Sequence, residues 1–163
     1  MCVRDIPWII DSIERLIRKN AFQPSTIFNF QTGGTVYTRA NGVAAPEGMV
    51  GYAYDAIKEA FYGEDADRLL LVQYETLVSH PGKVLAAVYD FIGVPHFAHD
   101  FKNVAFHAGA FDERAGTPGL HAVRPEVREN TRQTILPPDL FRRFENQAFW
   151  REPQCPPRQV RVV

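Results

Sequence analysis

The sequence has little cysteine, no long hydrophobic run and no excess of charge of one sign. Its two cysteines, Cys2 and Cys155, stand at opposite ends of 163 residues and form neither a metal-binding spacing nor a disulfide framework. No stretch approaches the roughly 18 apolar residues of a membrane span. Lys and Arg number 18 and Asp and Glu 19, whereas a general nucleic-acid binder is usually basic overall. We therefore expect no disulfide, metal cofactor, membrane partner or nucleic-acid partner.

The beginning of the chain also lacks the pattern of a secretory signal peptide. The apolar part of residues 1–10 is short and lies between Asp5 and Asp11. We therefore expect a cytoplasmic protein. The length fits one domain, and 12 Phe, 6 Tyr and 2 Trp give the chain the aromatic content of a folded core rather than of a disordered chain.

Hydrophobic spacing predicts two amphipathic helices in the first part of the chain. Over residues 6–19 isoleucine and leucine recur at intervals of three and four, and Asp5 can cap this helix. Residues 49–62 place alanine, isoleucine and phenylalanine on one helical face in the same way. The polar segment 21–47 between them predicts a long loop, with short extended pieces at 27–30 and 35–37.

The middle of the chain follows the strand, loop and helix order of an α/β protein. The run Leu69-Leu70-Leu71-Val72 between polar flanks predicts a strand buried on both faces, as in a parallel sheet. Residues 74–77 are expected to form a loop in which Glu75 caps the next helix. Pro81 begins that helix and Gly93 ends it.

The last third of the chain is expected to be less regular. Residues 98–138 are rich in Gly, His and Arg, and we expect them to be mostly irregular. A last helix is predicted over 139–150. The expected organisation is a single α/β domain over 1–150, followed by a loosely ordered tail over 151–163.

The residue that points most clearly to function is Arg4. It stands where a short strand, residues 1–3, gives way to the helix 6–19, and ligands of parallel α/β sheets bind at the carboxyl ends of strands. A helix N-terminus also offers free N–H groups to an anion. Ser12 lies at the edge of the apolar stripe of the helix. Arg4 and Ser12 could therefore hold one phosphate, by a forked charge-assisted contact and a hydroxyl hydrogen bond.

Three blocks of the sequence resemble the sulfotransferases that use 3′-phosphoadenosine 5′-phosphosulfate (PAPS). Val3-Arg4-Asp5 through Ser12 resembles their 3′-phosphate motif. Residues 71–77 (LVQYETL), with Pro81 and residues 91–95 (FIGVP), resemble their R-Y-E-D-L … P … F-L-G-L-P block. Residues 116–124 and 135–141 resemble the tail of a bacterial branch of the family. The blocks stand in the family's order and cover nearly the whole chain.

This resemblance implies both a fold and a reaction. The implied fold is α/β, a three-layer parallel-sheet sandwich related to the P-loop nucleotide kinases. The implied reaction passes a sulfuryl group from PAPS, as co-substrate, to a hydroxyl or amine of a small molecule or protein, and leaves 3′-phosphoadenosine 5′-phosphate (PAP). By resemblance, Arg4 and Ser12 would hold the 3′-phosphate and Tyr74 would lie near the adenine. The candidates for a basic loop that closes over the nucleotide are Thr117, Arg124, Arg128 and Arg132.

The chain departs from the family in one important respect. The family's phosphate loop, G-x-x-[RK]-[ST]-G-[ST]-[ST], lies upstream of the arginine motif and is missing here, together with the usual catalytic base. Gly33-Gly34-Thr35 contains no Lys or Arg and is not a substitute. In the related kinases the strand of that loop lies between the two strands predicted here. We therefore expect an incomplete sheet with a gap between them, in a chain that is the carboxyl part of a larger enzyme or is completed by a second chain.

Two other functions remain open from the sequence. One is a non-catalytic module that binds PAP or another nucleotide, or that needs a partner to complete its sheet. The other, a nucleotide kinase-like enzyme, is disfavoured because no Walker loop and no Mg²⁺-binding carboxylate motif is visible. Among the histidines, His121 is the candidate for a functional role, because it stands in a Gly-rich and Arg-rich loop. The sequence does not identify the acceptor.

Overall fold

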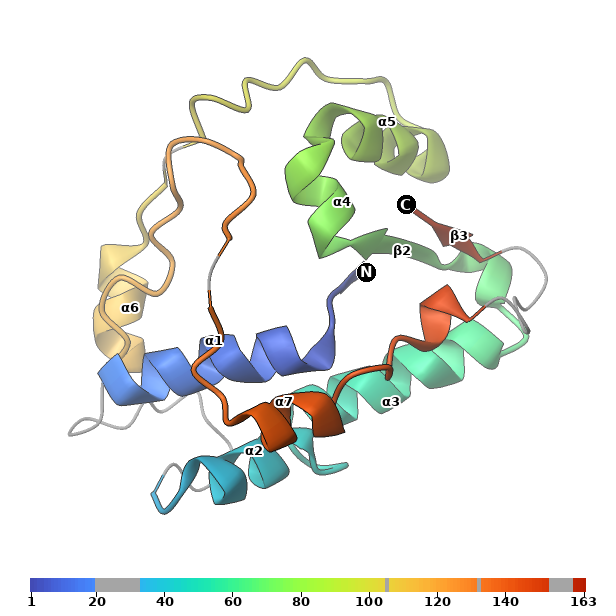
Figure 1. Cartoon of the computed structure of the whole chain (residues 1–163). Helices are drawn as coiled ribbons and strands as arrows, with labels where there is room; N and C mark the ends of the chain where they lie inside the picture. Colours follow the sequence, from blue (N-terminus) through green and yellow to red (C-terminus); the bar gives the residue numbers. More distant parts are fainter. Residues whose placement is uncertain (20–32, 105, 132, 153–159) are drawn as a thin grey trace.

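The computed structural model describes residues 1–19, 33–104, 106–131, 133–152 and 160–163. These residues form a small parallel sheet with helices on both sides of it (Figure 1). Within these ranges, no helix has the length and apolar character needed to cross a bilayer.

The described strands form one sheet in the order β1-β2-β3, and both pairs are parallel. β1 is Cys2–Val3, β2 is Leu70–Gln73 and β3 is Arg161–Val162. The register places Cys2 opposite Val72 and Val3 opposite Gln73. Leu70 and Leu71 of the central strand are buried, as the apolar run predicts, and Leu71 has no exposed surface. The α/β class is therefore confirmed.

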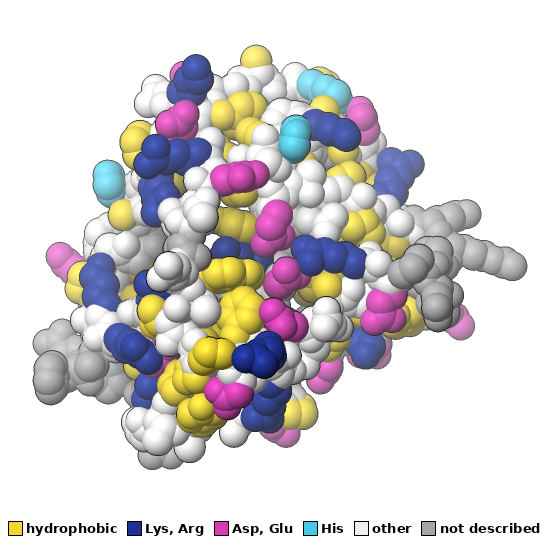
Figure 2. Space-filling view, viewed as in Figure 1, with side chains coloured by type: hydrophobic (Ala, Val, Ile, Leu, Met, Phe, Trp, Pro, Cys, Tyr) yellow, Lys and Arg dark blue, Asp and Glu magenta, His cyan; other side chains and the backbone are white. Residues whose placement is uncertain are grey.

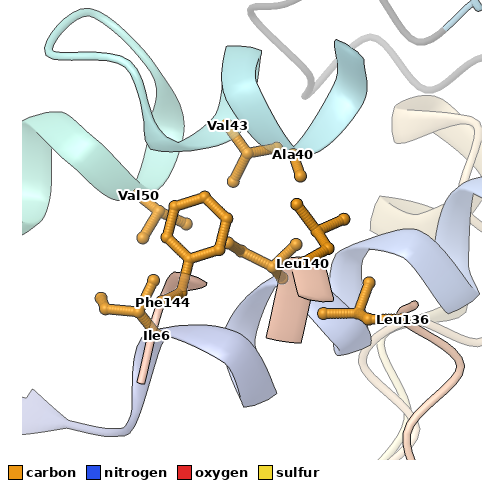
Figure 3. Packing of buried hydrophobic residues seen from close by; sticks show 8 residues of the cluster. Ile6, Ala40, Val43, Val50, Leu136, Leu140 and Phe144 are labelled. Atoms are coloured by element: carbon orange, nitrogen blue, oxygen red, sulfur yellow. The ribbon is translucent and has the colours of Figure 1, made fainter. Parts of the chain in front are cut away.

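Helices α1 (Ile6–Lys19) and α3 (Met49–Tyr62) have the bounds that the hydrophobic spacing predicts. Together with α2 (Val36–Ala44) and α7 (Pro138–Arg143), they enclose the larger core cluster. Figure 3 shows its side chains pointing toward one another from these helices. The buried members of this cluster are Ile6, Ile10, Ala40, Val43, Val50, Leu136, Leu140 and Phe144.

A second core cluster covers one face of the sheet. Phe61 of α3 packs there with Val3, Leu71 and two residues of the 3₁₀ turn η2 (Phe149–Arg151). On the other face lies α5 (Pro81–Ile92), which follows α4 (Tyr74–Ser79) and buries Val84. Another 3₁₀ turn, η1 (Ala66–Arg68), leads into β2, and α6 (Gly109–Ala115) lies in the last third of the chain.

Two buried carboxylates of α1 tie distant segments to the helix. Asp11 accepts hydrogen bonds from the Oγ1 of Thr134 at 2.9 Å and from the N–H of Ile135 at 2.7 Å. Glu14 accepts two hydrogen bonds from Arg39 of α2, at 2.7 and 2.8 Å. A buried carboxylate is costly unless it is paired, so these contacts hold α1 to the segment before α7 and to α2.

The sheet corrects the expectation of an empty strand position. β1 and β2 pair directly, so no gap separates the strand before Arg4 from the strand at Leu70. The end of the tail is also more ordered than expected. Arg161–Val162 pair with β2 as β3, and the Val163 N–H donates to Leu71 O at 2.9 Å. Paired backbone groups satisfy an edge that would otherwise be exposed.

Several helices differ from their sequence-based expectation. The predicted extended piece at 35–37 is the beginning of α2, whose cap is made by Thr35 and Thr38. The predicted loop at 74–77 is the short helix α4, and α6 lies in the segment expected to be irregular. The predicted helix 139–150 ends with α7 at Arg143, and η2 follows separately. The extended piece expected at 27–30 lies outside the described residues.

Candidate nucleotide site

The register of the sheet brings Arg4 and Tyr74 together. Because Val3 is paired with Gln73, the next residue of each chain segment lies just beyond the carboxyl end of its strand. The guanidinium carbon of Arg4 lies 4.1 Å from the centre of the Tyr74 ring. At that distance the cation is attracted to the face of the ring, which fixes the guanidinium over it. This is the edge at which parallel α/β sheets bind their ligands.

The side chain of Arg4 is held in place, but one of its hydrogen-bond donors has no acceptor within the described ranges. Its side chain is 24% exposed, and its Nε lies 3.6 Å from Oε1 of Glu75. That separation is longer than the 2.7–2.9 Å of a charge-assisted hydrogen bond. The Nε is buried and has no hydrogen-bond partner among the residues that the structure describes. A buried donor without a partner costs free energy, but a ligand reaches this atom only if the side chain moves, so the part of Arg4 open to an anion is the exposed 24% of its side chain.

A network of charges surrounds this arginine. Arg151 lies 3.5 Å from Oε2 of Glu75 and donates to Oδ1 of Asp5 at 2.6 Å and to Oε1 of Gln73 at 2.9 Å. Glu75 therefore lies between two arginines, and the predicted role of its side chain as a helix cap is replaced by this ion pairing. The network joins the turn between β1 and α1 to β2, α4 and η2 at the carboxyl edge of the sheet.

A cavity of about 300 Å³ opens beside Arg4 and Tyr74. Its aromatic members are Tyr74 and Trp8, and Trp8 makes an edge contact with Phe141, with ring centroids 5.2 Å apart. Two flat rings and a guanidinium suit a heterocyclic base that carries phosphate. The residues that line it are Arg4, Trp8, Tyr74, Glu75, Val78, Glu129, Asn130 and Thr131.

The structure separates the remaining candidates. Ser12 lies eight residues along α1 from Arg4, its Oγ donates to the carbonyl of Trp8 at 3.0 Å, and it does not line this cavity. Arg124 and Arg128 line a larger neighbouring cavity, which shares Tyr74 with the first. Thr117 is fully buried beyond the end of α6 and lines neither cavity. Arg132 lies outside the described residues.

His121 forms a pair with a buried carboxylate, away from both cavities. Its Nδ1 lies 2.5 Å from Oδ1 of Asp112, and its backbone N–H donates to Oδ2 at 3.0 Å. The hydrogen bond from His121 holds the pKa of Asp112 below its usual value, against the opposing effect of burial. The turn 116–121 is thereby attached to α6. Lys19 at the end of α1 donates to Pro118 O at 3.4 Å, which places this turn a whole helix length, about 20 Å, from Arg4.

Two features of the site were not visible in the sequence. Trp8 lines the cavity beside Arg4, and no motif in the sequence marks it as a site residue. Glu75 contacts Arg4 through the pairing of two strands that are 67 residues apart along the chain, and no sequence spacing indicates that contact. The register of β1 on β2 is the information that would have found the contact of Glu75 with Arg4.

Figure 2 shows acidic and basic side chains interspersed on one face, with hydrophobic side chains exposed among them in the region of α1 and α7. In the described ranges, no group of three or more His, Cys, Asp or Glu side chains is placed to hold a metal ion.

Comparison with known proteins gives no relative: no family model, no curated protein and no solved structure matches this chain. Its function is therefore inferred from the geometry around Arg4 and Tyr74.

Proposed function

We propose that this chain binds the 3′-phosphoadenosine end of PAPS beside Arg4 and Tyr74 and acts as a sulfotransferase. The observation that carries the proposal is the position of these two side chains, one in contact with the other, past the carboxyl ends of adjacent parallel strands. That edge is where nucleotides bind in related α/β architectures. The resemblance of the Arg4 and Tyr74 segments to the sulfotransferase motifs supplies the identity of the nucleotide.

Arg4, Trp8 and Tyr74 fit this ligand chemically, whereas Glu75 and Glu129 of the same lining carry charge of the same sign as its phosphates. The guanidinium of Arg4, on a side chain that is 24% exposed, can donate to a phosphate oxygen. Glu75 is an exchangeable partner, because it is 47% exposed and only loosely paired with Arg4 at 3.6 Å. Trp8 and Tyr74 present ring faces or edges to a planar base. A cavity of about 300 Å³ is at the lower end of the usual size of ligand sites.

In the proposed reaction, the acceptor oxygen or nitrogen forms a bond to sulfur while the bond from sulfur to the 5′-phosphate oxygen breaks. The acceptor proton passes to solvent, and PAP leaves with the bridging oxygen. Arg4 and Tyr74 anchor the nucleotide and do not move protons. Their contribution to the rate is positioning, which can supply a large part of the barrier reduction in group transfer.

The direct pairing of β1 and β2 favours a second candidate, a module that binds PAP without transferring a sulfuryl group. In the family, the strand of the phosphate loop would lie between these two strands, and in this structure they are neighbours. Nucleotide binding through Arg4 and Tyr74 does not require that strand. The two candidates therefore share one binding site and differ in turnover.

One experiment separates the two candidates. The chain is incubated with PAPS and a phenolic acceptor, 2-naphthol, and PAP and naphthyl sulfate are measured by mass spectrometry. Sulfotransferase activity predicts that both products form in equal amounts and that Arg4→Gln abolishes them. If PAP binds but no products form, the chain is the non-catalytic binding module. If PAP does not bind at all, both candidates are wrong.

A further inference from the structure

A second and larger cavity, of about 520 Å³, lies next to the candidate nucleotide site. Its walls are α4, α5 and the segments 99–104 and 123–130, which lie across from α4 in Figure 1. The opposite segments are tied together, because Val104 N–H donates to Pro125 O and Val127 N–H donates to Phe101 O, both at 2.9 Å. The cavity is therefore bounded by hydrogen-bonded backbone and by helices.

Most of the residues that line this cavity are apolar. Most of its lining side chains carry no polar atom, so they favour a ligand with a hydrophobic body over a sugar or a phosphate. These apolar residues are Leu77, Val78, Pro81, Leu85, Phe101, Val104, Val123 and Val127.

The rim of the cavity is cationic. Arg124 and Arg128 line it, and neither makes an ion pair, hydrogen bond or ring contact with any residue in the described ranges. Glu126 is the acidic side chain on the same wall, so the two guanidinium groups outnumber the carboxylate. His99 completes the wall, with its Nε2 held 2.6 Å from the hydroxyl of Tyr89 and its ring stacked on Phe101.

We propose that this cavity binds an organic anion with an apolar, ring-sized body, whose anionic group is held by Arg124 and Arg128. Uncommitted guanidinium groups bind carboxylate, sulfonate or phosphate without first giving up a partner. Tyr74, Val78 and Asn130 line both cavities, so the bound molecule lies beside the nucleotide site. We further infer that this molecule is the sulfuryl acceptor. That role rests on the proposed function, whereas the binding of the molecule in the cavity does not.

The test uses naphthalene-2-sulfonate as the anionic probe and 2-naphthol as its neutral counterpart, with binding to the whole chain measured by calorimetry. The double variant Arg124→Gln/Arg128→Gln is expected to weaken sulfonate binding at least tenfold and naphthol binding less than twofold. The matched control is Arg142→Gln on the exposed face of α7, which is expected to change neither. Circular dichroism establishes that each variant is folded.

The variant Val127→Asp places a charge in the apolar part of the lining and is expected to weaken the binding of both probes. The proposal is overturned if the sulfonate does not bind the unmodified chain, or if the double variant binds it within twofold of the unmodified chain. The variant Arg4→Gln tests the proposed function independently of this proposal. It is expected to remove PAP binding and to leave sulfonate binding intact. Sulfonate binding without PAP binding would refute the nucleotide site alone.

Discussion

The guanidinium of Arg4 lies over the ring of Tyr74, although 69 residues separate them along the chain. The contact is a consequence of the parallel register, which pairs the residue before Arg4 with the residue before Tyr74. Such a contact contributes about 0.5–1 kcal/mol at a partly exposed site. Its larger effect is geometric, because it presents the guanidinium at the sheet edge with one N–H group unsatisfied.

Replacing Glu75 with Gln is expected to strengthen PAP binding about threefold to tenfold. The carboxylate of Glu75 pairs with Arg4 at 3.6 Å, and a phosphate must compete with it for the guanidinium. Removing its charge removes that competition and a repulsion between two anions. Calorimetric titration with PAP measures the change, at two salt concentrations because screening reduces it. Glu113→Gln on α6 is the control, and unchanged affinity in Glu75→Gln would show that Glu75 does not compete.

Leu140→Ala is expected to reduce the free energy of unfolding by about 2–5 kcal/mol. Leu140 is 1% exposed and packs among side chains of α1, α2 and α3 (Figure 3), so its loss leaves a cavity between several helices. Urea unfolding followed by circular dichroism measures the change. Ile92→Ala provides the comparison, since Ile92 is 57% exposed and is expected to cost less than about 0.5 kcal/mol. Equal costs for the two variants would contradict the packing described.

Glu14 is expected to make stability depend on pH in the acidic range. Burial opposes its ionisation, but hydrogen bonds from Arg39 and Arg18 outweigh burial and hold the pKa of Glu14 below its ordinary value of 4.5. The unfolded chain therefore binds the proton at higher pH than the folded chain. The stabilisation is present above about pH 4.5 and is lost as pH falls through the folded-state pKa.

The variant Glu14→Gln measures this contribution. It is expected to lower the free energy of unfolding at pH 7 by about 1–3 kcal/mol, because Arg39 loses its charged partner. Below pH 4 the difference from the unmodified chain is expected to shrink. Melting temperatures between pH 3 and pH 7 test both points, and a difference that grows as pH falls would reverse the predicted sign.

The sequence predicted the elements that carry a long periodic pattern. Ile6, Ile10 and Ile17 repeat at helical spacing and are all buried, and Ile6 and Ile10 belong to the larger core, so α1 has the predicted bounds. The Leu70–Leu71 strand followed from an apolar run too short for a helix. Shorter elements were missed. The six residues of α4 span fewer than two turns, and the Thr35–Thr38 cap of α2 lacks the usual Glu or Gln at its third position.

The site was predictable only in part, because tertiary pairing assembles it. The strand-to-helix position of Arg4 follows from the sequence, but its contact with Tyr74 and Glu75 depends on which strands pair and in what register. The direct pairing of β1 with β2 could not be read from either strand alone. The position of Thr117 also depends on tertiary structure. This residue stands in a loop with basic residues, yet it is buried where the turn 116–121 folds against α6.

The most direct test of the central claim compares PAP with 5′-AMP, which lacks the 3′-phosphate, on the unmodified chain and on Arg4→Gln. Trp8 lines the site, so its fluorescence reports binding. The substitution Trp150→Phe, made in the unmodified chain and in the Arg4→Gln variant, removes the other tryptophan from the signal. We expect PAP to bind the unmodified chain at least tenfold more tightly than AMP. We expect Arg4→Gln to bring PAP to the affinity of AMP, because the lost interaction is with the 3′-phosphate. Equal affinities of PAP and AMP for the unmodified chain, or a preference for PAP that survives Arg4→Gln, would contradict the assignment of Arg4 to the 3′-phosphate.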